Sequence, residues 1–309
     1  MGNSSDVPAE VAPGSAGYRQ LFGMAYRMLG SVHDAQDAVQ DGFERWQGLT
    51  PQQRGLIREP IAWLTRVISR ICLDHLGSAR VRRESYRGMW LPEPMLGALP
   101  DAYGSRLSPT SDPADVVTLD ESVSMALLVA MEQLTPPERV SLILHDVFQV
   151  PFAEIAEIVG RTPEACRKLA SSARRSIHAQ RRFDVPSPER DKVVEAFARA
   201  CVHGNVEALA AVLDPNVVSR ADGGATVTAA RQPVVGALRV AGYLIGVLGR
   251  EHQRRGRLSV AIEPVNGRAG IVARTEGKIV GVVDLAIVDG HVAEITLLVN
   301  PDKLGAAPT

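Results

Sequence analysis

The sequence predicts a multidomain protein in which two all-α helical domains are followed by a cone-shaped α+β domain with an antiparallel sheet. Three observations support this fold class. Residues 15–91 and 120–183 carry apolar side chains at the three- and four-residue spacing of amphipathic helices. Residues 92–119 are rich in Pro, Gly and Ser over most of their length, which predicts a linker. Residues 189–304 begin with helical spacing and end in short apolar runs separated by turn signals.

Length and composition limit the class of protein. At 309 residues and 45% apolar, the chain can supply a core for each block. Its net charge is only −1, so any contact with nucleic acid would use local patches. Three scattered cysteines, Cys72, Cys166 and Cys201, argue against a disulfide framework or a metal knuckle. Without a signal peptide or the ~20 apolar residues of a membrane span, we expect a cytoplasmic protein with no membrane contact.

The first block contains three predicted helices, over residues 18–29, 32–46 and 60–83. The side chains on the inner face of the second helix are Ala35, Ala38, Val39 and Phe43. The opposite face, here called the acidic ridge, consists of Asp34, Asp37, Gln40, Asp41 and Glu44. Taken alone, such a ridge is better explained by a solvated helix face than by a binding surface.

The third helix of this block combines an apolar run with a row of cations. The apolar side chains are Ala62, Trp63, Leu64, Val67, Ile68 and Ile71. The cations are Arg66, Arg70, Arg80, Arg82 and Arg83. We expect Trp63 to belong to the core rather than to serve as a stacking platform.

Residues 151–182 predict a helix-turn-helix. A short helix ends at the turn of Gly160, and Thr162 and Pro163 are suited to begin the next helix. An apolar stripe of Cys166, Ala170, Ala173 and Ile177 follows. Between Arg161 and Arg182 there are seven Lys or Arg and one acid, so this helix is attractive to phosphates and slim enough for a major groove. The residues predicted to contact DNA are Arg161, Arg167, Lys168, Ser171, Arg174 and Arg175.

The third block opens with two amphipathic helices and continues with four strands, over residues 258–263, 269–274, 278–288 and 291–299. The signals Asn266-Gly267, Glu276-Gly277 and Asp289-Gly290 between them predict tight hairpins and an antiparallel meander. A cone of helices on such a sheet can hold a pocket, and some domains of this type are enzymes. Candidates for such chemistry, by residue type only, are Asp222, Asp284, His252, His291 and Tyr243.

The first two blocks resemble extracytoplasmic-function sigma factors of bacteria. YRQLFGMAYRMLGSVHDAQDAVQDGFERW and REPIAWLTRVISRICLDHL resemble region 2 of that family, and residues 151–182 resemble region 4. The resemblance implies that the acidic ridge binds core RNA polymerase, where Asp34, Ala35, Asp37 and the following Ala-Val-Gln match the family's motif. It also implies that the third helix, including Asp74 and His75, binds the promoter −10 element, and that the helix-turn-helix binds the −35 element.

Further motifs resemble the sigma-factor subgroup with a fused SnoaL-like domain. Trp90, Leu91, Pro92, Glu93 and Pro94, where the first block meets the linker, match that subgroup's WLPEP linker motif. The tail carries its NPDKL motif as Asn300, Pro301, Asp302, Lys303 and Leu304. Its DGGG motif is present as Asp222, Gly223 and Gly224, with Ala225 in place of the last glycine. The resemblance implies contacts between the SnoaL-like domain and the linker or region 2.

The sequence therefore predicts a transcription initiation factor whose partners are core RNA polymerase and promoter DNA, modulated by its own third domain. A small ligand of that domain is left open. We expect no enzyme activity, no metal and no other cofactor, since no catalytic triad, metal cluster or phosphate-binding glycine loop is found. The alternative is an isomerase- or cyclase-type enzyme fused to a DNA-binding module.

Overall fold

The computed structural model describes residues 8–84, 86, 88–97, 124–180, 187–255 and 258–305. These residues form two compact units. The first contains the described residues up to Glu84 and from Ala130 to Ala179. The second contains residues 86–97, 124–129 and those from Gln180 onward. The beginning of the predicted linker therefore belongs to the same unit as the third domain, while residues 98–123 lie outside the described part.

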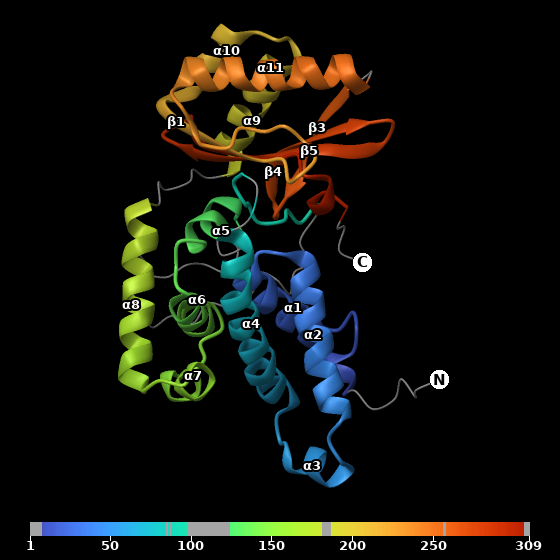
Figure 1. The fold of residues 1–309 in the computed structure, drawn as a ribbon, viewed down its shortest axis with the longest axis vertical. Coiled ribbons are helices and arrows are strands. Elements are labelled where there is room, and N and C mark those ends of the chain that lie inside the picture. The colour runs from blue at the N-terminus through green and yellow to red at the C-terminus, as the bar shows by residue number, and fades with distance from the viewer. Residues whose placement is uncertain are drawn as a thin grey trace. The chain divides into compact units, whose positions relative to one another are not determined.

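The N-terminal part of the first unit is a small helical bundle. Its helices are α1 (Ala16–Leu29), α2 (Val32–Gln47), α3 (Pro51–Leu56) and α4 (Pro60–Glu84). Figure 1 shows α1, α2 and α4 side by side, and these three helices pack on one another. Ser15 and Ser31 cap α1 and α2 by accepting hydrogen bonds from the backbone N–H three residues later. The three predicted helices are confirmed, each to within two residues at both ends.

The sequence prediction missed the short helix α3. Thr50 and Gln53 form a capping box around its first turn, and Pro51 occupies its first position. None of its residues is buried, so it carries no apolar periodicity from which it could have been predicted. Local capping, rather than packing, accounts for this helix.

The C-terminal part of the first unit contains α6 (Pro136–Leu142), a π-helical turn (Ile143–Val147), α7 (Phe152–Val159) and α8 (Pro163–Gln180). Helix α5 (Met125–Met131) precedes them and is divided between the two units. Gly160 has φ 69°, a left-handed conformation that ends α7 and turns the chain into α8. The predicted helix-turn-helix is thus present.

The two helical parts of the first unit contact each other through a buried arginine. Arg139 in α6 is 2% exposed and donates from Nε and Nη2 to the carbonyl oxygen of Arg27 near the end of α1, at 3.4 and 3.3 Å. Its other terminal nitrogen donates to Glu132 at 2.5 Å. The Arg27 guanidinium in turn lies 5.8 Å from the centre of the Phe148 ring. A buried, paired charge of this kind ties the two parts into one unit.

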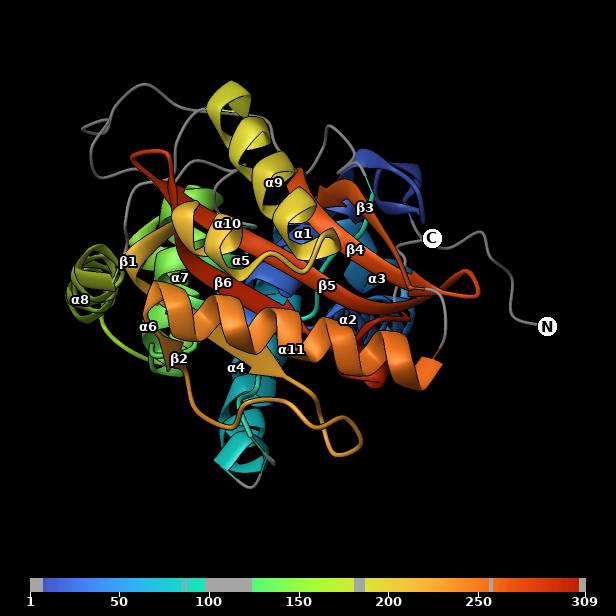
Figure 2. The same ribbon diagram turned by 90° about the horizontal axis from the view of Figure 1, so that it is seen from above.

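The second unit is a sheet with helices on one face. Figure 2 shows α9 (Ser187–Val202) and α11 (Ala237–Arg255) lying across the same face of the sheet, with α10 (Val206–Ala211) next to them. The strands run in the order β2-β1-β6-β5-β4-β3. Their bounds are β1 Leu213–Asp222, β2 Val234–Val235, β3 Leu258–Val265, β4 Arg268–Thr275, β5 Lys278–Val288 and β6 His291–Leu298. A 3-10 turn, Pro301–Lys303, follows β6.

The antiparallel meander from β3 to β6 is confirmed. Each of its three turns has positive φ at both residues, for example 51° at Asn266 and 77° at Gly267. That is the geometry of the two-residue hairpin that the Asn-Gly and Asp-Gly signals predict.

The sequence did not reveal β1, which pairs with β6 in parallel through Val218↔Glu294 to Asp222↔Leu298. The sheet is therefore mostly rather than wholly antiparallel.

The core of the second unit lies between the helices and this sheet. Phe197 of α9, Leu209 of α10 and Leu244 of α11 pack against strand residues such as Leu285 and Ile295. Burial of these side chains fixes the helices on the sheet. The carboxyl ends of the parallel strands β1 and β6 lie beside each other, so Asp222 and Asn300 emerge at the same end of the sheet.

Candidate functional site

Helix α8 separates an inner apolar stripe from an outer basic face. Cys166, Ala170, Ala173 and Ile177 are all buried, as predicted. Thr162 caps the helix, since its hydroxyl oxygen accepts from Ala165 N at 3.2 Å. The cations on the outer face that are exposed are Arg161, Arg167, Lys168 and Arg175, and Ser171 is half-buried. These side chains form a surface with which a helix can meet phosphates and base edges.

Arg174 has a structural contact that the sequence did not predict. Its Nε and Nη2 donate to the two carboxylate oxygens of Asp146 at 2.6 and 2.7 Å, and Asp146 is almost fully buried. The pair joins α8 to the π-helical turn across 28 residues of sequence, so no local pattern signals it. The Arg167 guanidinium lies 5.3 Å from the centre of the Phe152 ring in α7. Both contacts hold α8 against the rest of its domain.

The acidic ridge occupies the solvent face of α2. Asp37, Gln40, Asp41 and Glu44 are exposed, while Asp34 is half-buried in the first turn. Within the ridge, Gln40 donates to Glu44 at 3.2 Å, and His33 lies 3.0 Å from Asp37. Ala35, Ala38 and Val39 are buried on the opposite side, and the half-buried Phe43 stacks on Tyr18 with ring centres 6.1 Å apart. The side-chain directions predicted for this helix are confirmed.

On α4, Arg66, Arg70 and Asp74 are exposed, and His75 is half-buried. The side chains of Arg80, Arg82 and Arg83, in the last turns of the helix, lie outside the described part. Trp63 is half-buried and meets the buried Trp46 edge to face, with ring centres 5.4 Å apart. This contact places Trp63 in the packing of the bundle, as expected.

In the second unit, one buried carboxylate binds the start of the linker. Asp222, at the end of β1, is 0% exposed. Its Oδ1 accepts from the Tyr86 hydroxyl at 2.6 Å, and its Oδ2 accepts from Leu91 N at 3.0 Å and from Lys303 Nζ at 2.8 Å. Lys303 also donates to the carbonyl oxygen of Leu91 at 2.5 Å. The carboxylate and the ammonium group thus compensate each other and share the linker backbone as a partner.

Aromatic rings enclose this ion pair. The Lys303 Nζ lies 4.1 Å from the centre of the Trp90 ring and 5.4 Å from that of Tyr86. Asn300 Nδ2 donates to the Tyr86 hydroxyl oxygen at 2.9 Å. Burial, followed by the hydrogen bond to Asp222, raises the pKa of Tyr86 above its ordinary value, so the hydroxyl keeps the proton that it donates. The linker cluster is the name used below for Tyr86, Trp90, Leu91, Asp222, Asn300 and Lys303.

The two glycines after Asp222 are required by close approach. A Cβ at Gly223 would overlap the carbonyl oxygen of Val227, and a Cβ at Gly224 would overlap the Asn300 side chain. Gly224 also has φ 63° and donates its N–H to Asp222 Oδ1 at 2.9 Å. Ala225, which stands in place of the third glycine, does not have a positive φ. The motif is therefore a turn that brings the Asp222 carboxylate and the NPDKL tail together.

A second contact follows along the linker. Met95 N donates to Asn266 Oδ1 at 2.9 Å, and Asn266 N donates to the Met95 carbonyl oxygen at 2.7 Å. Leu96 forms a β-bridge with Val265, and Gly97 N donates to the Pro264 carbonyl oxygen at 3.0 Å. Four of the five residues of the WLPEP motif are buried, and Trp90 is half-buried. The sequence missed Tyr86 altogether, and it indicated Asn266 only as a turn residue.

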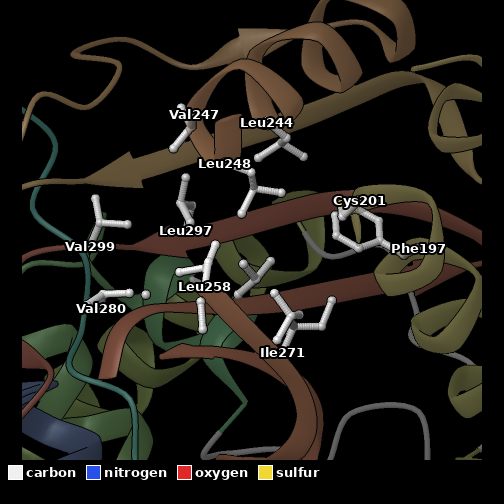
Figure 3. A pocket seen from close by; sticks show the side chains of 14 residues that line it. Phe197, Cys201, Leu244, Val247, Leu248, Leu258, Ile271, Val280, Leu297 and Val299 are labelled. Atoms are coloured by element: carbon white, nitrogen blue, oxygen red, sulfur yellow. The ribbon is translucent and has the colours of Figure 1, made fainter. Parts of the chain in front are cut away.

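A cavity of about 60 Å³ lies between the helices and the sheet of the second unit. In Figure 3, Phe197 and Cys201 from α9 and Leu244 and Val247 from α11 converge on side chains of the sheet, including Leu297. The wall is apolar throughout. Burial raises the pKa of Cys201 to about 12, so its thiol adds no charge.

The five residues with possible catalytic chemistry do not come together. Asp284 is paired with Arg190 at 3.3 Å, Asp222 belongs to the linker cluster, and His291 is exposed at the start of β6. None of the four candidates whose side chains are described lines the apolar cavity, and the side chain of His252 lies outside the described part. Among the described residues, no three or more His, Cys, Asp or Glu are grouped so as to hold a metal ion. In the same part of the chain, no helix combines the length and apolar character needed to cross a membrane.

Comparison with known proteins gives matches over nearly the whole chain. Residues 15–82 match the family Sigma-70 region 2, and residues 124–177 match Sigma-70, region 4. The ECF RNA polymerase sigma factor SigJ of Mycobacterium tuberculosis is 35% identical over 97% of this chain and 94% of its own. The probable ECF RNA polymerase sigma factor SigI of the same species is 36% identical over 94% and 95%.

The crystal structure of the M. tuberculosis extracytoplasmic function sigma factor SigJ is similar in fold. It superimposes with a TM-score of 0.71 at 30% identity, covering 95% of this chain and 97% of that one. The similarity therefore extends through both helical parts and the α+β domain.

Proposed function

The chain belongs to the extracytoplasmic-function RNA polymerase sigma factors, and we propose that it uses three separate surfaces for initiation and its SnoaL-like domain to control them. As a member of that family it is an alternative sigma factor, which binds core RNA polymerase and promoter DNA. The proposal assigns region 2 to residues 15–91, the linker to 92–119, region 4 to 120–183 and the SnoaL-like domain to 189–304. It also places the protein in the cytoplasm, where the polymerase is.

The acidic ridge on α2 is the proposed contact with the polymerase. Four of its five members are exposed while the opposite face of the same helix is buried, so the ridge can meet a partner without unfolding. This exposure pattern is the observation on which the proposal depends. Its negative charge would select a basic surface and orient the encounter.

Charge reversal tests this surface. We expect the double variant Asp37→Lys, Asp41→Lys to bind core polymerase at least tenfold more weakly, because each change replaces attraction by repulsion. The matched control, Asp191→Lys with Glu195→Lys, reverses two exposed acids on α9 and should bind normally. Run-off transcription and a binding titration with purified core polymerase give the readout. Equal affinities of the two variants would contradict the assignment.

The −35 element is assigned to the exposed residues of α8, and the −10 element to the outer face of α4. Arg161, Arg167, Lys168 and Arg175 are free of the apolar core and available to phosphates and bases. Arg174 acts through Asp146, which fixes the helix that carries the others. On α4 the assigned side chains are Arg66, Arg70, Asp74 and His75, followed by Arg80, Arg82 and Arg83.

The SnoaL-like domain is proposed to regulate by holding the linker. The support is the linker cluster, in which a fully buried carboxylate and its lysine partner both bind the backbone of Leu91. Control of this kind requires that the docked and released linkers differ in affinity for polymerase or promoter.

A graded truncation tests the regulatory role. Ending the chain after Gly305 keeps the whole linker cluster, whereas ending it after Val299 removes Asn300 and Lys303. We expect the first to give the promoter output of the full chain and the second to change it. Identical output from both would refute regulation through this cluster.

We further propose that the protein has no enzyme activity. The cavity of the SnoaL-like domain is lined by carbon and one neutral thiol, with none of the described acid or base candidates in its wall. General acid–base chemistry needs such a group within hydrogen-bond reach of the substrate. Turnover of a steroid ketone or polyketide by the purified chain would refute this.

A further inference from the structure

We propose that the SnoaL-like domain binds an amphipathic carboxylic acid, with its alkyl chain in the apolar cavity and its carboxylate at Arg250. This inference deepens the regulatory role proposed above and depends on it only for the effect on the linker. The binding itself is argued from two adjoining cavities of the second unit and can be tested independently.

The first cavity selects a hydrocarbon. It holds about 60 Å³, which corresponds to roughly four or more water-sized positions at about 10–15 Å³ each. Its wall offers no hydrogen-bond partner except the Cys201 thiol, a weak donor that burial keeps protonated. A polar group or a cluster of waters would lose its hydrogen bonds there, whereas an alkyl group would only leave water.

The second cavity supplies a polar end. It is smaller, about 30 Å³, and shares four wall residues with the first: Val247, Val280, Leu297 and Val299. It adds Thr228, Tyr243 and Arg250 to its wall. The two cavities are therefore neighbours, and the proposal has an unbranched molecule span them from the apolar end to the polar one.

The chemistry of the polar end indicates a carboxylate. The Arg250 guanidinium offers paired N–H donors in the geometry that a carboxylate accepts. The Tyr243 hydroxyl oxygen accepts from Ala230 N at 3.1 Å, which leaves its own hydrogen as a donor toward the cavity. Arg250 is exposed, so the charged head of the ligand would stay partly hydrated and would not pay for full burial of a charge.

The same cavity wall continues into the linker cluster. Leu297 and Val299 line both cavities, and Val299 N donates to the carbonyl oxygen of Asp222 at 2.9 Å. The next residue, Asn300, donates to Tyr86. A ligand that moves Val299 therefore moves groups that bind the linker, and it can shift the linker equilibrium if it binds the two states with different affinity.

Calorimetric titration of the full chain tests the binding. We expect octanoate to bind and the affinity to rise about fourfold per methylene from hexanoate upward, until the cavity is filled and the rise stops. 1-Octanol, which lacks the charge, should bind about tenfold more weakly than octanoate. Absence of binding below the micellar concentration, or equal affinity for the acid and the alcohol, would overturn the proposal.

Variants locate the site. Arg250→Gln should weaken octanoate about tenfold and leave 1-octanol unchanged, and Val247→Trp should abolish both by filling the junction of the cavities. Arg239→Gln, an exposed position of the same helix outside both walls, is the matched control and should bind octanoate normally. If Val247→Trp does not fold, the Arg250→Gln result and the chain-length series still decide. Loss of octanoate binding in the control as great as in Arg250→Gln would overturn the assignment.

The effect on the linker is read from 19F-tryptophan NMR of the full chain, with the Trp90 signal assigned by Trp90→Phe. Octanoate should shift this signal in the wild type and not in Arg250→Gln at the same concentration. Binding without any change at Trp90 would refute the coupling. Because run-off transcription without octanoate tests the proposed function separately, failure of the ligand and failure of the sigma-factor assignment can be told apart.

Discussion

Replacement of Asp222 by asparagine should release the linker. The carboxylate is 0% exposed and accepts four hydrogen bonds, from Tyr86, Leu91 N, Gly224 N and Lys303. Asparagine has the size of aspartate but only one acceptor oxygen. Its NH₂ group must therefore point at some of the groups that donate hydrogen bonds to the Asp222 carboxylate. It also leaves the ammonium group of Lys303, which is 8% exposed, without its counter-charge.

The magnitude follows from these contacts. Breaking a buried ion pair by removing one partner costs about 3–5 kcal/mol. Part of that cost can be relieved if the linker leaves and water reaches Lys303, so the docked population should fall by about a hundredfold to a few thousandfold. Urea unfolding of the full chain measures the loss of stability, and the 19F signal of Trp90 measures the population of docked linker.

Two controls make the result specific. Asp302→Asn removes an exposed carboxylate from the same tail and should change stability by less than about 0.5 kcal/mol. Asp222→Asn combined with Lys303→Met removes both charges and should recover part of the loss. If Asp222→Asn unfolded like Asp302→Asn and left the Trp90 signal in place, the reasoning from the buried pair would be refuted.

Gly224→Ala should lower the free energy of unfolding by about 1–3 kcal/mol and disorder the linker cluster, because Gly224 has φ 63° and an added Cβ has no room. The control Gly249→Ala, in open space on α11, should leave stability unchanged or raise it. Equal melting temperatures of the two variants would contradict this prediction. Asp146→Asn should lower the stability of the first unit by about 1–2 kcal/mol and weaken −35 recognition, because it breaks the ion pair with the partly exposed Arg174. Thermal unfolding measures the stability, and run-off transcription measures the recognition. If neither changed, Asp146 would not anchor α8. The pKa of Tyr86 is raised in the folded state, so its contribution to stability is present below about pH 10 and declines as the pH rises above that value. Urea titrations over this pH range should show a smaller loss of stability for Tyr86→Phe than for the wild type. An identical pH profile of the two proteins would refute the claim.

Local signals were sufficient for most elements of the fold. The periodicity of α2 and α8 predicted which side chains are buried, because a helix that packs on one side must repeat its apolar residues every three or four positions. The Asn266-Gly267 and Asp289-Gly290 turns predicted the hairpins, because few residues other than Asn, Asp and Gly adopt positive φ without strain.

Strand β1 and two side-chain contacts were missed because they depend on residues that lie far apart in the sequence. Strand β1 pairs in parallel with β6, about 75 residues later, and a parallel pair has no turn between its strands to signal it. Helix α3 has no buried residue and so no apolar pattern. The bond between Tyr86 and Asp222 spans 136 residues, and the Arg174–Asp146 pair spans 28.

The composition of the linker cluster bears on the control that we propose for the SnoaL-like domain. Tyr86 and Leu91 precede the linker, Asp222 ends β1, and Lys303 lies in the tail, so the shell around one carboxylate is closed by three separate segments of the chain. Removing any one segment leaves the other two with a buried charge or donor that lacks its partner, at a cost of a few kcal/mol. Partly docked states are therefore poorly populated, and the linker is either held by the whole cluster or released from it. On this proposal, a small change at the end of β6, next to Val299, should shift the balance between those two states.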